Sequence, residues 1–358
     1  MSSIVIKLEQ NDSNVISFIT EYKGKRVDRV WYRDTINNFK EIKFETLDFA
    51  MVGYIMKAMR LGKDLKAKGP VYGQTLDNLM LFQKQVNEWW PKYKIVDVEA
   101  TEVRSIKENI NDKYMCSFTS GVDSTFTSIN RRKDLGAILY IAGCDVSLSC
   151  TMELESIRQV ILNLFKDTGI ELKYIDTNIK GVLGDHDKTH ACQILSVAWL
   201  FSALYRGFIM SDSSVYPEYP WGANALTSPC LGNDYFEVAH EIYRDRTQKI
   251  KRIYEDWPKA YNSLRVCWEN TRRSCRADEN CCECKKCIRA LLSFKALGIE
   301  RPESFKRDVE IRDLEMLKNP QYEHEPFFLK CLYENVERYG KKDMDIFRKV
   351  KEVLDEIS

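Results

Sequence analysis

The stretch Thr119-Ser120-Gly121-Val122-Asp123-Ser124-Thr125 decides the fold class of this 358-residue chain. It follows a short apolar run at residues 114–118 that is typical of a buried strand. Small residues let such a loop close around an anion, and the start of a following helix directs free N–H groups at it. The hydroxyl side chains in the loop add further donors. The alternative is that Asp123 or Ser124 only caps the helix.

Strands and helices alternate after this loop. Strands are predicted at residues 136–141, 171–175 and 207–210, with a further candidate at 264–268. Helices are predicted at 157–165 and 188–205. This alternation predicts an α/β fold with a doubly wound parallel sheet, whose ligands bind at the carboxyl ends of the strands.

The regions on either side of this alternation differ from it. Residues 1–105 predict a small α+β domain, with strand-like runs at 3–8, 15–19 and 27–32 followed by helices at 47–61 and 74–90. The α/β domain covers residues 106–298. Residues 299–358 are predicted to form a charged helical extension, to which we assign no chemistry.

Composition excludes several classes of protein. Apolar residues make up 44% of the chain and charged residues 30%, which excludes intrinsic disorder. A net charge of +1 argues against a broad, nonspecific surface for nucleic acid or for an anionic membrane. The first residues do not resemble a signal peptide, and polar residues interrupt the apolar tract at 192–210. We therefore expect a soluble, cytoplasmic protein.

Six of the twelve cysteines fall between Cys267 and Cys287. In a chain of this size without a signal peptide, such a cluster indicates metal binding. Cys281, Cys284 and Cys287 form a C-x-x-C-x-x-C motif, and tetrahedral Zn²⁺ needs one more thiolate. The candidates for this fourth ligand are Cys267, Cys275 and Cys282, of which Cys282 fits least because its neighbour already occupies the three-residue spacing. An iron–sulfur cluster or reduced thiols without metal are the alternatives.

The loop resembles the pyrophosphate loop, Ser-Gly-Gly-x-Asp-Ser, of the PP-loop ATP pyrophosphatases, which adenylate a substrate and release pyrophosphate. Thr119 stands at the first Ser and Ser120 at the first Gly, whereas Gly121, Asp123 and Ser124 match. The resemblance implies the fold of the adenine nucleotide alpha hydrolases, with ATP and Mg²⁺ as cofactors. Residues 119–125 would then bind the nucleotide, with Asp123 and Ser124 as catalytic residues.

Together, the loop and the cysteine motif resemble 7-cyano-7-deazaguanine synthase, the QueC family, over roughly residues 113–297. In that family a lone cysteine precedes the motif and completes a structural zinc site, which implies Cys267 as the fourth ligand. Residues 1–105 and the C-terminal extension fall outside the resemblance. It therefore indicates a divergent member of the family.

The resemblance also implies a reaction. The chain would be an ATP-dependent, AMP- and pyrophosphate-forming ligase that adenylates 7-carboxy-7-deazaguanine. Ammonia would capture the adenylate to give an amide or nitrile, or another amine on a protein or nucleic acid would capture it. One alternative is a tRNA-modifying thiolase, against which the neutral charge and the lack of a free catalytic cysteine pair count. The other is a zinc-stapled binding module without catalysis.

Further site residues follow from the predicted strand ends. Arg246 and Lys249 are candidate cations, with Lys249 as a catalytic residue, although both also fit a solvated helix face. Adenine is expected near Asp145 and at two small residues, Ala142 and Gly143. The substrate base is expected at a polar segment that also fits a simple turn: Asp212, Ser213, Ser214 and Tyr216. Expected partners are ATP, a deazapurine acid and an acceptor, with no membrane, and a homodimer is compatible with the sequence.

Overall fold

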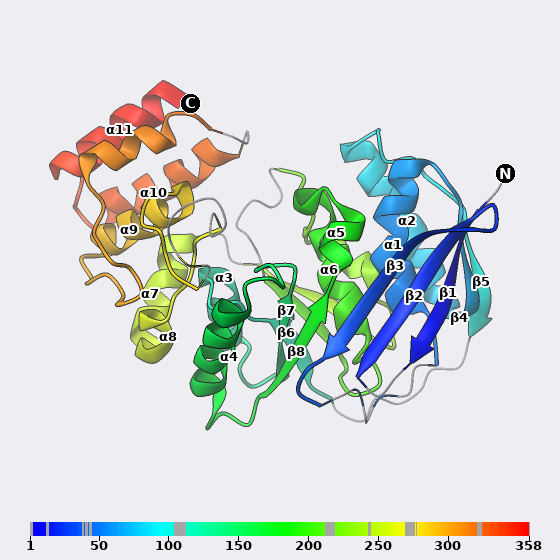
Figure 1. Ribbon diagram of the computed structural model, residues 1–358. Helices are drawn as coiled ribbons and strands as arrows, with labels where there is room; N and C mark the ends of the chain where they lie inside the picture. Colours follow the sequence, from blue (N-terminus) through cyan, green and yellow to red (C-terminus); the bar gives the residue numbers. More distant parts are fainter. Residues whose placement is uncertain are drawn as a thin grey trace.

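The computed structural model describes residues 3–11, 14–37, 39, 42, 45–103, 112–211, 219–242, 245–268, 276, 278–320 and 324–357. Within these residues, strands from both the predicted N-terminal domain and the predicted α/β domain form one mostly parallel sheet (Figure 1). Its ten strands are β1 Ile4–Asn11, β2 Val15–Tyr22, β3 Lys25–Asp34, β4 Leu65–Tyr72, β5 Val98–Val103, β6 Tyr114–Ser117, β7 Leu135–Ala142, β8 Glu171–Thr177, β9 Gly207–Ser211 and β10 Glu237–Glu241.

The order of the strands places the loop of residues 119–125. Across the sheet the strands run β10-β9-β6-β7-β8-β3-β2-β1-β4-β5, and the five from β10 to β8 are parallel. From β6 the chain proceeds to β7 and β8 on one side, then returns to β9 and β10 on the other. The loop after β6 therefore lies where the strand order reverses, which is the usual ligand position in a doubly wound sheet.

The N-terminal strands extend this sheet rather than forming another. Strand β3 pairs antiparallel with β8 through Tyr32–Thr177, Arg33–Asp176 and Asp34–Ile175. The division into units 1–105, 106–298 and 299–358 stays a prediction, but the sheet itself crosses the first of these boundaries. The sequence analysis missed β4 and β5. Strand β4 contains Gly69-Pro70, a dipeptide that usually marks a turn or a break, and its register with β5 shifts there.

Helices cover both faces of the sheet and build the C-terminal region. They are α1 Asp48–Leu61, α2 Gly73–Trp89, α3 Val122–Asn130, α4 Thr151–Phe165, α5 Ile179–Leu183, α6 His186–Trp199, α7 Arg246–Asp256, α8 Pro258–Asn262, α9 Lys285–Leu297, α10 Glu325–Arg338 and α11 Asp345–Ile357, with 3₁₀ turns η1 Ser228–Leu231 and η2 Ile311–Leu317. In the part of the chain that the structure describes, none is long and apolar enough to cross a membrane. The predicted helix at 188–205 ends early, at Trp199.

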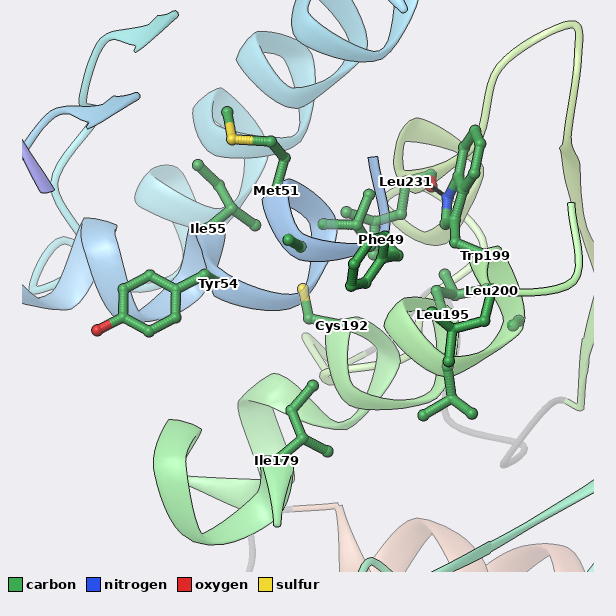
Figure 2. Close-up of a cluster of buried hydrophobic side chains, with 14 of the residues drawn as sticks. Phe49, Met51, Tyr54, Ile55, Ile179, Cys192, Leu195, Trp199, Leu200 and Leu231 are labelled. Carbon is green, nitrogen blue, oxygen red and sulfur yellow. Dashed lines mark hydrogen bonds between the residues drawn. The ribbon is translucent and has the colours of Figure 1, made fainter. Parts of the chain in front are cut away.

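One hydrophobic core joins the N-terminal region to the α/β region. Figure 2 shows Phe49, Met51 and Ile55 of α1 beside Cys192 and Leu195 of α6. The two helices approach so closely that a Cβ atom on Gly53 would lie 2.4 Å from Oγ of Ser196. Such packing fixes α6 against the sheet, and the first turn of α6 lines the cavity described below.

A second core lies at the opposite end of the molecule from the N-terminal strands (Figure 1). Apolar side chains of α3 and α7 pack there with those of α9, α10 and α11, which include Val122, Phe126, Ile250, Leu291 and Phe347. The C-terminal extension is thus packed against the helix that follows the loop of residues 119–125. This packing brings residues of the extension to the same cavity as the loop.

Candidate active site

The loop of residues 119–125 is held by its own hydrogen bonds. Strand β6 ends at Ser117, and α3 begins at Val122 with Gly121 as its N-cap. Oγ of Ser124 accepts from the backbone N–H of Thr119 at 3.2 Å and lies 3.2 Å from the carbonyl of Gly121, to which it donates. The side chain of Ser124 therefore closes the loop between a strand and a helix.

Ser120, the residue that departs from the family's glycine, has a left-handed backbone conformation with φ of 58°. A glycine adopts this conformation without steric penalty, whereas a serine does so at some cost. The carbonyl of Ser120 accepts a hydrogen bond from the backbone N–H of Arg265 at 2.9 Å. The family's glycine therefore has a physical reason, and the segment around Arg265 supports the loop here despite the serine.

The carboxylate of Asp123 forms ion pairs with two basic side chains. Its Oδ1 lies 2.8 Å from Nζ of Lys249, and its Oδ2 lies 3.2 Å from Nη2 of Arg246. Burial alone would raise the pKa of Asp123, but Arg246 and Lys249 outweigh it and lower this pKa to about 2. A carboxylate beside a phosphate-binding loop can hold Mg²⁺ or accept hydrogen bonds from the loop's own amides. The structure shows a third arrangement, in which the carboxylate fixes two cations beside the loop.

The two predicted cations occupy different environments. Both lie on the first turns of α7, whose N-cap Asp245 accepts from the backbone N–H of Gln248. The side chain of Lys249 is only 1% exposed and does not line the cavity, whereas Arg246 does. Lys249 is therefore placed to act through Asp123, and Arg246 can reach a ligand directly.

A cavity of about 440 Å³ opens beside the loop. Its walls come from the loop, the end of β7, the start of α6, the start of α9 and the start of α10. Thr119, Gly121, Asp123 and Ser124 of the loop line it. Ser120, Val122 and Thr125 do not line it, and all three are buried.

The predicted adenine residues lie beside the cavity rather than in its wall. Ala142 and Gly143 do not line it, whereas their neighbours Ile141, Cys144 and Asp145 do. Gly143 is required by its surroundings, because its φ is 94° and a Cβ atom there would lie 2.1 Å from the carbonyl of Thr177. The predicted substrate residues lie outside the described residues: Asp212, Ser213, Ser214 and Tyr216.

Four basic residues of the cavity wall were not predicted: Lys180, Arg265, Lys286 and Arg289. Arg265 forms an ion pair with Asp145, which links the segment after α8 to the end of β7. Lys286 lies inside the cysteine motif and Arg289 lies two residues beyond it, one turn apart on α9. The pKa of Lys286 is lowered to about 8 by burial and by the neighbouring charges of Arg246 and Arg289. The three-residue spacing between Lys286 and Arg289 is visible in the sequence and indicates that both side chains lie on one face of a helix.

The cysteine motif forms a compact group of sulfur atoms. One sulfur atom from each of Cys267, Cys281, Cys284 and Cys287 lies within 4.8 Å of the others. The Cys267–Cys284 and Cys281–Cys287 sulfur distances are both 3.9 Å. Tetrahedral Zn²⁺ with bonds of about 2.3 Å separates its ligand sulfurs by about 3.8 Å, so this group can hold such an ion. Cys282 lies outside the group, and Cys275 lies outside the described residues.

Backbone hydrogen bonds help to hold the four sulfur atoms in place. The backbone N–H groups of Glu283 and Cys284 donate to Sγ of Cys281, and Cys284 is the N-cap of α9.

The predicted strand at residues 264–268 is wrong, because its described residues belong to no ladder. The side chain of Asn280 holds this segment instead of a neighbouring strand. It accepts from the backbone N–H of Val266 at 2.8 Å and donates to the carbonyl of Leu264 at 2.7 Å. This contact brings Cys267 to the motif.

Histidines with lowered pKa values predict an acid-sensitive fold. Burial is the main cause that lowers the pKa of His190 to about 3, that of His240 to about 4, and those of His186 and His324 below their usual 6.5. Below pH 6.5 the unfolded chain then binds protons that the folded chain does not, so stability falls as the pH decreases from about 6.5 towards 4. Urea unfolding midpoints at pH 7.5, 6.0 and 5.0, with metal content determined at each pH, measure this effect.

The variant His190→Gln provides the control for this pH dependence. It removes one of the four histidines, so the decline in unfolding free energy between pH 6.5 and pH 4 should be smaller in the variant than in the parent chain. A parent chain whose unfolding free energy is the same at pH 7.5 and pH 5.0 would contradict the prediction.

Comparison with known proteins gives one match. GMP synthase [glutamine-hydrolyzing] of Christiangramia forsetii is 28% identical to the chain over 125 residues, which are 33% of this chain and 23% of the relative. The chain thus matches about a quarter of the length of that protein. No protein-family model and no solved structure matches the chain. The similarity supports the broad family of PP-loop ATP pyrophosphatases and does not single out the QueC family.

Proposed function

We propose that the chain is an ATP-dependent ligase that adenylates a carboxylic acid and releases pyrophosphate. The observation that carries this proposal is the arrangement at Asp123, where a PP-loop at the reversal of strand order is joined by two cations to α7. The similarity to GMP synthase over 125 residues gives independent, weaker support for an ATP-utilising ligase. The acid is 7-carboxy-7-deazaguanine, a choice that rests on the resemblance of the loop and the cysteine motif to the QueC family.

The reaction has two steps. A carboxylate oxygen attacks the α-phosphorus of ATP, the bond from that phosphorus to the bridging oxygen breaks, and pyrophosphate leaves. An amine nitrogen then attacks the acyl carbon, the carbon–oxygen bond to AMP breaks, and the nitrogen loses a proton. With ammonia the product is an amide, and a second adenylation on the amide oxygen followed by loss of AMP would give the nitrile. Another amine, on a protein or nucleic acid, would give a conjugate.

The residues of the loop suit the first step. Positioning and charge neutralisation dominate phosphoryl and nucleotidyl transfer, since little covalent chemistry falls to the protein. The backbone at Gly121 and the hydroxyl of Thr119 line the cavity and can donate to departing phosphate oxygens, and Arg246 can neutralise their charge. Lys249 holds Asp123, which in turn orients Arg246.

Two metal ions belong to this proposal. Mg²⁺ would be held mainly by the phosphates of ATP, because both oxygens of Asp123 are already engaged by cations. The four sulfur atoms of Cys267, Cys281, Cys284 and Cys287 fit Zn²⁺, which would cross-link the segment before the motif to α9. The cysteine group contributes no residue to the loop of residues 119–125.

Pyrophosphate release from ATP and Mg²⁺ tests the proposal. It is measured with 7-carboxy-7-deazaguanine present or absent and with ammonia added separately, using Asp123→Asn as the inactive control. Release that requires the acid supports the ligase, and mass spectrometry of the product distinguishes amide, nitrile and conjugate. Bound ATP without acid-dependent release would exclude this acid, and a chain that does not bind ATP would exclude the ligase and leave a zinc-stapled binding module.

A further inference from the structure

The loop and its two cations leave the charge of a pyrophosphate group only partly balanced. Arg246 and Lys249 share the carboxylate of Asp123, so these three side chains have one positive charge in excess. Pyrophosphate carries several negative charges, and more develop as it leaves the α-phosphorus. Bound Mg²⁺ neutralises part of this charge. A site that stabilises the leaving group needs further cations that are not already paired with carboxylates.

Two such cations on α9 line the same cavity. Among the described residues, Lys286 and Arg289 have neither an ion-pair partner nor a hydrogen-bond partner for their charged groups. Both lie within electrostatic reach of the loop. The positive charge of Lys286 acts to lower the pKa of Asp123, and the negative charge of Asp123 acts to raise the pKa of Arg289. Two unpaired cations three residues apart on one helix repel each other, so the arrangement favours an anion between them.

The side chains around these cations fix their positions. Cys284 and Cys287, two members of the sulfur group, flank Lys286 on the first turn of α9. The guanidinium of Arg289 lies 4.6 Å from the ring centre of Phe328 on α10. Nζ of Lys285 and Oε2 of Glu325 are 2.7 Å apart, and their side chains are 13% and 11% exposed, so this ion pair joins α9 to α10.

We propose that Lys286 and Arg289 form a second anion subsite, which binds the phosphate oxygens of the pyrophosphate leaving group opposite the loop. The cysteine group and Phe328 are positioning residues for this subsite. This gives the C-terminal extension a role, since α10 supplies Phe328 and Glu325. The inference rests on the proposed function only for the statement that pyrophosphate is a product, and its test requires no acid substrate.

Calorimetric titration of the metal-loaded full chain with inorganic pyrophosphate and Mg²⁺ tests the subsite. Met replaces either cation at similar length without its charge, so Lys286→Met and Arg289→Met should each raise the pyrophosphate Kd about tenfold or more. Arg289→Lys keeps the charge and should retain most of the affinity. Lys330→Met, at an exposed position of α10, is the matched control and should bind as the parent does.

The positioning roles have separate readouts. Phe328→Leu removes the ring beside Arg289 and should raise the pyrophosphate Kd about two- to fivefold. Removal of metal with a chelator should increase hydrogen exchange in the first turn of α9 and weaken pyrophosphate binding together. Unchanged exchange in that turn after complete metal loss would overturn the positioning role of the cysteine group.

The outcomes separate this inference from the proposed function. Pyrophosphate that binds Lys286→Met and Arg289→Met as tightly as the parent overturns the subsite, as does a parent chain that does not bind pyrophosphate. An equal loss in Lys330→Met also overturns it, because the effect would then reflect overall charge. If the variants lose affinity but the parent shows no acid-dependent pyrophosphate release, the result supports the subsite and excludes 7-carboxy-7-deazaguanine as the acid.

Discussion

Asp123→Asn is expected to abolish pyrophosphate release and to destabilise the fold by about 3 kcal/mol. The asparagine has the same shape, but it removes the negative charge that Asp123 places beside Lys249, whose side chain is 1% exposed. Breaking a buried ion pair from one side is strongly destabilising, and the 22% exposure of the Asp123 side chain places the effect at the lower end of that range. Urea denaturation and a pyrophosphate assay measure the two consequences.

A double-variant cycle separates the charge effect from a general disturbance of the loop. Lys249→Met removes the buried ammonium itself and leaves Asp123 with Arg246, so its loss of stability should be smaller. Adding Lys249→Met to Asp123→Asn should therefore restore part of the unfolding free energy. If the two losses simply add, the ion pair does not account for the stability of the loop.

Cys267→Ser is expected to have the other large effect. It removes one of the four sulfur atoms that fit Zn²⁺, so metal content should fall well below that of the parent, and the unfolding free energy should fall by more than about 3 kcal/mol. The reason is structural: residues 264–267 belong to no strand and are held by Asn280 and by the sulfur group. Metal analysis and thermal unfolding with and without chelator measure both changes.

Cys282→Ser is the matched control for this prediction. Cys282 is adjacent to the motif and 1% exposed, yet its Sγ contacts the carbonyl of Asn280 instead of joining the four sulfur atoms. It should keep the metal content of the parent and lose little stability. Equal metal loss in Cys267→Ser and Cys282→Ser would contradict the assignment of Cys267 as the fourth ligand.

Local signals in the sequence determined much of the fold. The apolar run before residue 119 and the small residues after it predict a strand, an anion-binding turn and a helix, because these depend on neighbouring residues. The strands at 136–141, 171–175 and 207–210 are confirmed as β7, β8 and β9 for the same reason. Strand β4 was missed because Gly69-Pro70 is a local break signal, which pairing with β1 and β5 overrides.

The sequence also determined which residues can carry the chemistry: the loop of residues 119–125, the C-x-x-C-x-x-C motif and the basic residues at the start of α7. Only the tertiary structure decided how they are used. It buried Lys249 behind Asp123, selected Cys267 over Cys282, joined β3 to β8, and brought α9 and Phe328 of α10 to the cavity beside the loop. These are contacts between residues far apart in the chain, which depend on helix packing and strand order and leave no periodic signal in the sequence.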